Sequence, residues 1–257
     1  MSQEITVSRT GRTLHIRLDR ADKRNAVTRS MYEAMVDAIA EAETDETIRA
    51  VLVLFSGAGD GFCAGNDLND FLADPPTGMD SPAFRFLGAI STAKKVLVAA
   101  VHGAAVGIGT TMLLHCDLVL AARSAKLSLP FVTLGLVPEA ASTLLLPRAI
   151  GHLRAAQLLL LGQPIDAETA LHWGLVNRVV DDATLIDVAI ETVTRICSLP
   201  PSAVRLSKQL LKDDRGGIAE RIEQEASIFV DRLRAPEFQE AASAFLEKRA
   251  ADFSQFS

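Results

Sequence analysis

Residues 96–109 read Val-Leu-Val-Ala-Ala-Val-His-Gly-Ala-Ala-Val-Gly-Ile-Gly, and this stretch decides the class of fold. Its first six residues form a continuous apolar run, which is typical of a strand buried on both faces of a parallel sheet. The glycine-rich remainder predicts a tight turn that opens a helix ending near His115. A buried strand that leads through a turn into a helix indicates an α/β protein.

The same alternation of strand and helix extends on both sides of this stretch. The expected elements are strands at 5–8 and 13–18, a helix at 28–43, a strand at 50–55, a helix at 81–94, and strands at 117–121 and 127–129. The first two predict a hairpin, and the others imply right-handed crossovers within a mainly parallel sheet. A glycine-rich loop is expected at 56–65, and an irregular segment at 70–80, which contains two prolines and a glycine.

The chain after residue 140 has the periodicity of helices. The expected helices span 141–150, 153–161, 167–173, 183–199, 202–212, 218–233 and 237–248. The last two carry an apolar stripe on one face, formed by Ile222, Ala226, Phe229, Leu233, Phe238, Ala241 and Phe245. Such stripes are typical of core packing, and near a C-terminus they also serve contact with another subunit.

Composition argues against several classes of protein. The chain has 257 residues, of which 49% are hydrophobic, and this is enough for one large core. A net charge of −6 argues against a nucleic-acid surface. Three cysteines without paired spacing suit a reducing compartment, and five scattered histidines predict no metal site. The sequence shows neither a signal-peptide pattern nor an apolar run of about 18 residues. We therefore expect a cytoplasmic protein without a membrane span.

A single carboxylate, Glu139, lies in the stretch 130–142, which reads Pro-Phe-Val-Thr-Leu-Gly-Leu-Val-Pro-Glu-Ala-Ala-Ser. Apolar surroundings destabilise the charged form of a carboxyl group and raise its pKa toward the range useful for proton transfer. This makes Glu139 a candidate general base. The alternative is a glutamate that merely opens a helix at Ala140, where it complements the helix dipole. On this stretch alone, both interpretations stay open.

The turn at 103–109 also predicts a site for negative charge. Glycines let backbone N–H groups point at a ligand, and the helix that follows adds its dipole. A second donor is expected from the turn Ala64-Gly65-Asn66, and two such N–H groups make an oxyanion hole. The alternative is that these glycines only permit tight turns and close helix packing.

Other catalytic patterns are weaker. The sequence contains no Gly-x-Ser-x-Gly elbow and no phosphate-binding loop, and Gly107-x-Gly109 lacks the third glycine of a dinucleotide fingerprint. His102 and His115 lie beside apolar runs, where a packed or hydrogen-bonded histidine is commoner than a base. Cys63 is expected to be a small buried hydrophobe.

Short motifs that belong together are spread over nearly the whole chain. They are Arg24-Asn25-Ala26, Phe62-Cys-Ala-Gly-Asn-Asp-Leu68, Ala100-Val-His-Gly103, Gly107-Ile-Gly109, Cys116-Asp117, Gly174-Leu175-Val176, Pro236-Glu237-Phe238 and Ala244-Phe-Leu-Glu-Lys-Arg249. As a set they resemble the crotonase superfamily, that is, the enoyl-CoA hydratase/isomerase family. The resemblance implies an α/β ββα superhelix (the ClpP/crotonase fold) with a spiral core at 1–200 and a helical oligomerisation region at 201–257. It also implies acyl-CoA thioester substrates, no cofactor beyond the CoA of the substrate, and a homotrimer or dimer of trimers.

The resemblance assigns roles to particular residues. The backbone N–H groups of Asn66 and Ile108 would bind the thioester oxygen, and Arg24 and neighbouring loop residues would lie along the CoA. Phe245 or Lys248 would reach the CoA of an adjacent subunit. The full set of expected substrate contacts is Arg24, Ala26, Ala64, Gly65, Asn66, Asp67, Leu68, Gly107, Ile108, Phe131, Leu134, Phe245 and Lys248. Phe131, Leu134 and Leu136 are expected to form a dry acyl pocket.

Departures from the family pattern point to a particular reaction. Hydratases of the family use two glutamates, but Thr111 and Phe131 occupy those positions here. In its Pro-Glu element and the Gly-Asn-Asp-Leu motif, the sequence is similar to peroxisomal-type Δ3,Δ2-enoyl-CoA isomerases, in which Glu139 would be the base. Alanine also replaces a frequent glycine at Ala140 and Ala141. The main hypothesis is therefore an isomerase. A hydratase or another thioester enzyme is the second hypothesis, and a non-catalytic acyl-CoA-binding protein is the third.

Overall fold

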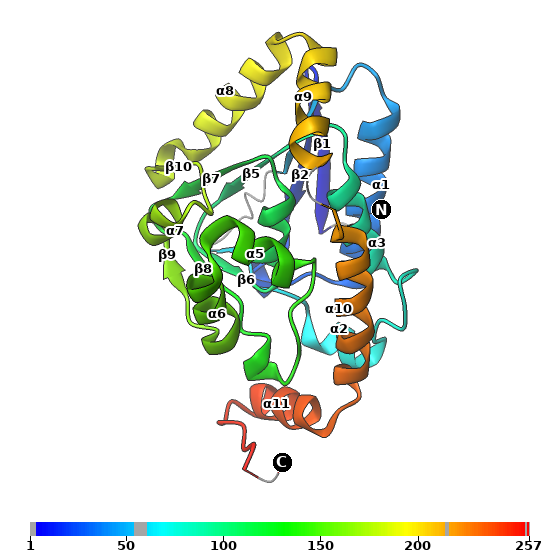
Figure 1. Cartoon of the computed structure of the whole chain (residues 1–257), viewed down its shortest axis with the longest axis vertical. Coiled ribbons are helices and arrows are strands. Elements are labelled where there is room, and N and C mark those ends of the chain that lie inside the picture. The colour runs from blue at the N-terminus through cyan, green and yellow to red at the C-terminus, as the bar shows by residue number, and fades with distance from the viewer. Residues whose placement is uncertain (1–3, 54–60, 214–215, 255, 257) are drawn as a thin grey trace.

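Two sheets form the centre of the protein, for which a computed structural model describes residues 4–53, 61–213, 216–254 and 256 (Figure 1). The large sheet has the order β1-β2-β3-β5-β7-β10 and the small one β4-β6-β8-β9. The strands of the large sheet are β1 Ile5–Thr10, β2 Thr13–Leu18, β3 Ala50–Val53, β5 Val96–Val101, β7 Leu118–Ala122 and β10 Arg178–Val180. Those of the small sheet are β4 Gly61–Cys63, β6 Ala104–Val106, β8 Lys126–Ser128 and β9 Ile165–Asp166.

The chain winds between these sheets as a spiral. In sequence, β3 precedes β4, β5 precedes β6, and β7 precedes β8, so each turn visits the large sheet and then the small one. Within the large sheet β2, β3, β5, β7 and β10 pair in parallel, whereas β1 and β2 form the predicted hairpin. Helices return the chain between turns. This repetition confirms the ββα superhelix implied by the family resemblance.

Helices surround the two sheets (Figure 1). Their bounds are α1 Arg29–Thr44, α2 Leu68–Ala73, α3 Pro82–Thr92, α4 Ile108–Thr111, α5 Ser142–Ile150, α6 His152–Leu161, α7 Ala167–Trp173, α8 Leu185–Ser198, α9 Pro201–Asp213, α10 Ile218–Leu233 and α11 Pro236–Glu247. One turn of 3-10 helix, Met112–His115, continues α4. None of the helices in the described ranges is long and apolar enough to cross a bilayer.

The packing on both faces of strand β5 explains why its sequence is apolar without interruption. Val96, Val98 and Ala100 pack into one hydrophobic cluster, together with the buried face of α8. Leu97, Ala99 and Val101 pack into a second, larger cluster on the other side of the sheet. Because alternate side chains of a strand point to opposite faces, both faces of β5 need apolar residues. The predicted doubly buried strand is confirmed.

The prediction of a single sheet was wrong, because two expected glycine-rich turns contain strands. Gly61–Cys63 forms β4 and Ala104–Val106 forms β6, and these two strands pair in parallel. Three-residue strands are too short to show periodicity in the sequence. They persist because their backbone groups find partners in the small sheet. The remainder of the loop predicted at 56–65, and the end of the strand predicted at 50–55, lie partly outside the described residues.

Two further predictions of local structure are corrected. The segment 70–80 is irregular only from residue 74, because α2 occupies Leu68–Ala73. The Asp67 side chain caps this helix by accepting hydrogen bonds from the backbone N–H groups of Asn69 and Asp70. The region after residue 140 also contains strands β9 and β10, whose two or three residues lie between helices.

The C-terminal helices α10 and α11 share the main core. The apolar stripe of α10 and the Phe238 side chain of α11 belong to the larger hydrophobic cluster. The Phe229 ring meets the rings of Phe71 and Phe84 edge-on, with centroids 6.4 Å apart in each pair. The stripe of α10 is therefore core packing within one chain, whereas in α11 Phe238 is buried and Phe245 is 63% exposed. The division at residue 200 and a role in oligomerisation stay predictions.

Candidate active site

A cavity of about 420 Å³ opens where the loops after several strands meet α10 and α11. It brings together most of the predicted substrate contacts, namely Ala26, Ala64, Gly65, Asn66, Asp67, Leu68, Gly107, Ile108, Phe131, Leu134 and Phe245, and also Leu136. Most of its wall is apolar, as a pocket for an acyl chain requires. Arg24 and Lys248 do not line this cavity, so their contact with CoA stays a prediction.

The backbone of Asn66 is fixed by a parallel bridge to Val27. The Val27 N–H donates to the Gly65 carbonyl at 2.8 Å, and the Asp67 N–H donates to the Val27 carbonyl at 2.9 Å. In extended backbone, successive N–H groups point to opposite sides. The Asn66 N–H therefore points away from Val27, on the side of the cavity that Asn66 lines.

A second N–H belongs to Ile108, the first residue of α4. Gly107 precedes it with φ of +54°, a left-handed conformation that glycine adopts without strain. The Gly107 carbonyl accepts hydrogen bonds from the Thr110 and Thr111 N–H groups, at 2.8 and 2.9 Å. The first N–H of a helix has no acceptor within the helix, so the Ile108 N–H is available to a ligand in the cavity.

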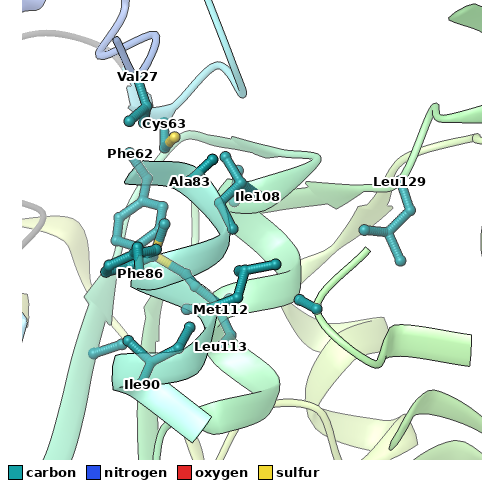
Figure 2. Close-up of a cluster of buried hydrophobic side chains, with 14 of the residues drawn as sticks. Val27, Phe62, Cys63, Ala83, Phe86, Ile90, Ile108, Met112, Leu113 and Leu129 are labelled. Atoms are coloured by element: carbon teal, nitrogen blue, oxygen red, sulfur yellow. The ribbon is translucent and has the colours of Figure 1, made fainter. Parts of the chain in front are cut away.

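Core packing holds this helix start in place. The Ile108 side chain is fully buried in the cluster that contains Phe62, Cys63 and Met112 (Figure 2). A Cβ atom at Gly109 would lie 2.8 Å from the Cys63 Cβ and 2.9 Å from the Cys63 carbonyl oxygen. Only glycine therefore lets α4 approach β4 so closely. This approach brings the turns that carry Asn66 and Ile108 to the same cavity, and the role of their N–H groups as an oxyanion hole stays a prediction.

Glu139 is buried, with 3% of its surface exposed, and it is not among the residues that line the cavity. Burial raises the pKa of Glu139 from 4.5 to about 8, and the nearby Glu225 carboxylate adds to this effect. The Thr111 hydroxyl donates to Glu139 Oε1 at 3.3 Å and works in the opposite direction. A carboxyl group that gains and loses a proton near neutral pH is suited to general base catalysis.

Two other buried groups connect Glu139 with the predicted oxyanion hole. Burial, with a contribution from the charge of Glu139, raises the pKa of Tyr32 well above its usual range. The same causes raise the pKa of the Cys63 thiol to about 12, so this thiol stays protonated. The Tyr32 hydroxyl donates to Asn66 Oδ1 at 2.6 Å. The Tyr32 hydroxyl thus links the side chain of Asn66, which lines the cavity, to a buried group on whose pKa the charge of Glu139 acts.

The turn after Glu139 excludes the simple helix-start interpretation. Ala140 and Ala141 both have left-handed backbone, with φ of +61° and +52°, and α5 begins only at Ser142. Left-handed backbone costs a residue with a side chain about 1–2 kcal/mol. The His115 ring donates from Nε2 to the Ala140 carbonyl at 2.8 Å. The prediction that His115 is a buried, hydrogen-bonded histidine is confirmed.

Asp67 is a carboxylate that does line the cavity, and it is already engaged in an ion pair and a helix cap. Although burial opposes the effect, hydrogen bonds and the charge of Arg20 lower the pKa of Asp67. The Arg20 Nη1 lies 2.7 Å from Asp67 Oδ2, and the other carboxylate oxygen caps α2. Asp67 is thus a charged structural group. Thr111, fully buried, and Phe131, in the cavity wall, supply no second acid or base.

Sequence reasoning missed several residues of the site. The cavity wall also contains Lys23, Asn69, Phe71, Val106, Pro130, Thr133, Phe229 and Leu246. Tyr32 was missed as well, although the only tyrosine of the chain stands in the apolar stripe of α1. Asn25 proves structural: its buried side chain donates to the carbonyls of Gly61 and Phe62 and so holds β4. Among the described residues, no cluster of His, Cys, Asp and Glu has the arrangement of a metal site.

Comparison with known proteins agrees with this geometry. The family model described as enoyl-CoA hydratase/isomerase matches residues 9–256. The 1,2-epoxyphenylacetyl-CoA isomerase of Escherichia coli (strain K12) is 36% identical over 92% of this chain and 93% of its own length. The enoyl-CoA delta isomerase 2 of Rattus norvegicus is 33% identical over 96% of this chain, which spans 64% of that protein. Other relatives, at 31% and 33% identity, are named as hydratases.

A solved structure shares the whole fold. The enoyl-CoA hydratase/isomerase from Pseudoalteromonas atlantica T6c superimposes with a TM-score of 0.92 and is 41% identical. The match covers 98% of this chain and 100% of that one. Family model, relatives and fold agree over nearly the full length. The chain therefore belongs to the enoyl-CoA hydratase/isomerase family, whose members act on acyl-CoA thioesters.

Proposed function

We propose that the protein is a Δ3,Δ2-enoyl-CoA isomerase, which moves the double bond of a 3-enoyl thioester into conjugation. One observation carries the proposal: Glu139 is the only carboxyl group of the described site that is buried, protonatable near neutral pH and not engaged by a cation. Shifting a double bond needs one base that accepts a proton and returns it. Adding water needs a base that activates the water while C2 is protonated, and two carboxylates serve that reaction better.

In the proposed reaction the substrate lies in the cavity, and the buried Glu139 carboxyl serves as its base. Glu139 removes a proton from C2, and the negative charge moves to the thioester oxygen. The N–H groups of Asn66 and Ile108 hold this oxygen, and each such donor contributes about 3–4 kcal/mol in comparable enzymes. Glu139 then returns the proton at C4, which completes the 2-enoyl thioester. Positioned base catalysis contributes about 10²–10⁴-fold.

The direct test is to incubate the purified protein with 3-hexenoyl-CoA and follow the conjugated product by its absorbance. We expect turnover, and we expect Glu139→Gln to reduce kcat by at least about 10²-fold because glutamine accepts no proton. Glu223→Gln, an exposed position on α10, is the matched control and should behave like the parent chain. Near-normal activity of Glu139→Gln would sink the assigned role.

Hydration is the second candidate, since relatives with hydratase names share this fold. It predicts that crotonyl-CoA is converted to 3-hydroxyacyl-CoA faster than 3-hexenoyl-CoA is isomerised. A non-catalytic acyl-CoA-binding protein would bind the thioester but would not exchange C2 protons in deuterated water. The two measurements separate the three functions.

We also infer an assembly of three chains, or of two such trimers. Large apolar side chains stay exposed on the single chain, including Leu153 and Leu160 of α6 and Leu210 and Leu211 of α9. Exposed apolar faces of this kind are commonly covered by contact between subunits. Light scattering should give three or six times the mass of one chain, and a monomer at micromolar concentration would overturn this inference.

A further inference from the structure

Helix α10 contacts the segment 130–143 at two positions. The Arg232 Nε donates to the Gly135 carbonyl at 3.0 Å. One carboxylate oxygen of Glu225 accepts hydrogen bonds from the Thr143 N–H at 3.1 Å and from the Thr143 hydroxyl at 2.5 Å. Between these two residues, Phe229 lines the cavity. Positions 225, 229 and 232 are spaced by four and three residues, so they lie on one face of the helix.

The burial of the Glu225 carboxylate is unfavourable for the stability of the fold. Its side chain is buried, with 5% exposed, and its second oxygen, Oε2, has no hydrogen-bond partner among the described residues. An unsatisfied buried polar atom costs about 1–3 kcal/mol, and more when it carries charge. The stability of the fold alone therefore does not account for this carboxylate.

What Glu225 holds is the strained turn of the candidate base. Ala140 and Ala141 are left-handed, and α5 has no side-chain cap of its own at Ala141. Glu225 caps the helix from α10 instead, through the Thr143 N–H. On the other side, His115 binds the Ala140 carbonyl. The backbone that follows Glu139 is thus fixed from two directions.

We propose that Glu225 is a positioning residue for Glu139: through its hydrogen bonds to Thr143, it holds the left-handed turn that follows the base. This inference rests on the proposed role of Glu139 as base. It makes α10 part of the catalytic apparatus of its own subunit. A phenylalanine that shapes the acyl cavity and a carboxylate that acts on the base then lie on the same helix face.

Beside this geometry, the charge of an ionised Glu225 contributes to the raised pKa of Glu139, and the pKa of Glu225 is itself raised. Burial raises the pKa of Glu225, whereas the hydrogen bonds from Thr143 and Ala141 and the charge of Arg221 oppose this. The titratable groups linked to the two carboxylates are Arg221 on α10, Tyr32 on α1 and Cys63 on β4, and His115 donates to the Ala140 carbonyl beside Glu139. The positive charge of Arg221 favours the ionised form of Glu225, and the Arg221 Nη1 donates to the Thr143 hydroxyl at 3.2 Å.

Comparing Glu225→Gln with Glu225→Ala separates two effects of Glu225: its hydrogen bonds to Thr143, and its charge, which acts on the pKa of Glu139. Glutamine keeps an acceptor for Thr143 but has no charge, so the acidic limb of the kcat–pH profile should move down by about half a unit or more, with kcat at high pH within about threefold of the parent. Alanine removes both the acceptor for Thr143 and the charge, so in Glu225→Ala kcat should fall about tenfold or more in addition to the shift of the profile, with a smaller change in KM. Glu223→Gln on the same helix is the control. An unshifted profile in Glu225→Gln would overturn the charge effect, and equal kcat in all three variants would overturn the holding effect.

Two further measurements keep the proposal testable if a Glu225 variant does not fold or the parent lacks isomerase activity. Thr143→Ala removes one hydrogen bond to Glu225 and should lower kcat, whereas Thr143→Ser keeps the hydroxyl and should restore it. The Glu139 carboxyl can also be titrated directly by carbon NMR in protein labelled at glutamate, with Glu139→Gln identifying its signal. A parent without isomerase activity but with a Glu139 titration that moves in Glu225→Gln would refute the proposed function and retain the coupling. An unmoved titration would refute the coupling itself.

Discussion

At the scale of single residues, Glu139 shows how a site exchanges stability for reactivity. Its carboxyl group is buried and, within the described part of the chain, accepts one hydrogen bond, from Thr111, so its charged form is poorly solvated. The same burial that makes it a stronger base also makes its ionisation unfavourable for the folded chain. The two left-handed alanines after it add strain to the same short segment.

The raised pKa of Glu139 predicts that the difference in stability between Glu139→Gln and the parent chain depends on pH. Because the pKa is raised from 4.5 to about 8 in the folded chain, folding retains a proton that the unfolded chain releases. The free energy of unfolding should therefore fall as the pH rises from about 4.5 to 8. Glutamine does not ionise and still accepts a hydrogen bond from Thr111, so the variant should be more stable at pH 9 by an amount on the order of 3 kcal/mol.

Urea unfolding of parent and variant at pH 5 and pH 9, at equal protein concentration, measures this effect. The difference should be several-fold smaller at pH 5, because the folded carboxyl stays protonated there and pH 5 lies only half a unit above the unfolded pKa of 4.5. An equal difference at the two pH values would contradict the assignment of a raised pKa to Glu139.

At the scale of elements, the site depends on how closely α4 approaches β4. Gly109→Ala should disturb this approach, because the new Cβ would lie 2.8 Å from the Cys63 Cβ and 2.9 Å from its carbonyl oxygen. The Ile108 N–H would shift with the helix start. Loss of one donor of an oxyanion hole costs about 10²–10³ in kcat, so we expect at least a tenfold loss in 3-enoyl-CoA turnover.

The matched control for this variant is Gly88→Ala in α3. No atom lies within 4 Å of the Cβ that would be added there, so activity should be unchanged and helix propensity slightly improved. Steady-state kinetics together with thermal unfolding of both variants separates a lost donor from a lost fold. Parent-like kcat in a folded Gly109→Ala protein would show that the approach is not needed.

At the scale of the whole molecule, the C-terminal helices are joined to the spiral by aromatic packing. Phe229→Ala should lower the free energy of unfolding by about 3–5 kcal/mol, since its ring is buried against Phe71 and Phe84. It should also raise KM, because the same ring lines the cavity. Ile228→Ala, half-exposed on the same helix, is the control and should cost well under half as much. Equal losses in denaturant unfolding would show that α10 is not part of the core.

Much of the fold was predictable because its signals are local and strong. The apolar run of β5, the turn between β1 and β2, and the Thr28 cap of α1 follow from side-chain burial and backbone geometry over a few residues. Strands β4 and β6 were not predictable in this way. They have three residues each, and glycine-rich sequence does not reveal that extended backbone will find a partner from another turn of the spiral.

The candidate site likewise has features that the sequence predicts and features that depend on the folded structure. The sequence by itself determined which groups were available: one carboxylate in an apolar stretch, threonine and phenylalanine where a hydratase has acids, and two glycine turns that free backbone N–H groups. Only the tertiary structure decided their environment. Thr111 donates a hydrogen bond to Glu139, and the charge of Glu225, from a helix more than eighty residues later in the chain, acts on its pKa. A pKa and an aligned donor depend on neighbours in space, and residue order does not specify those neighbours until the chain has folded.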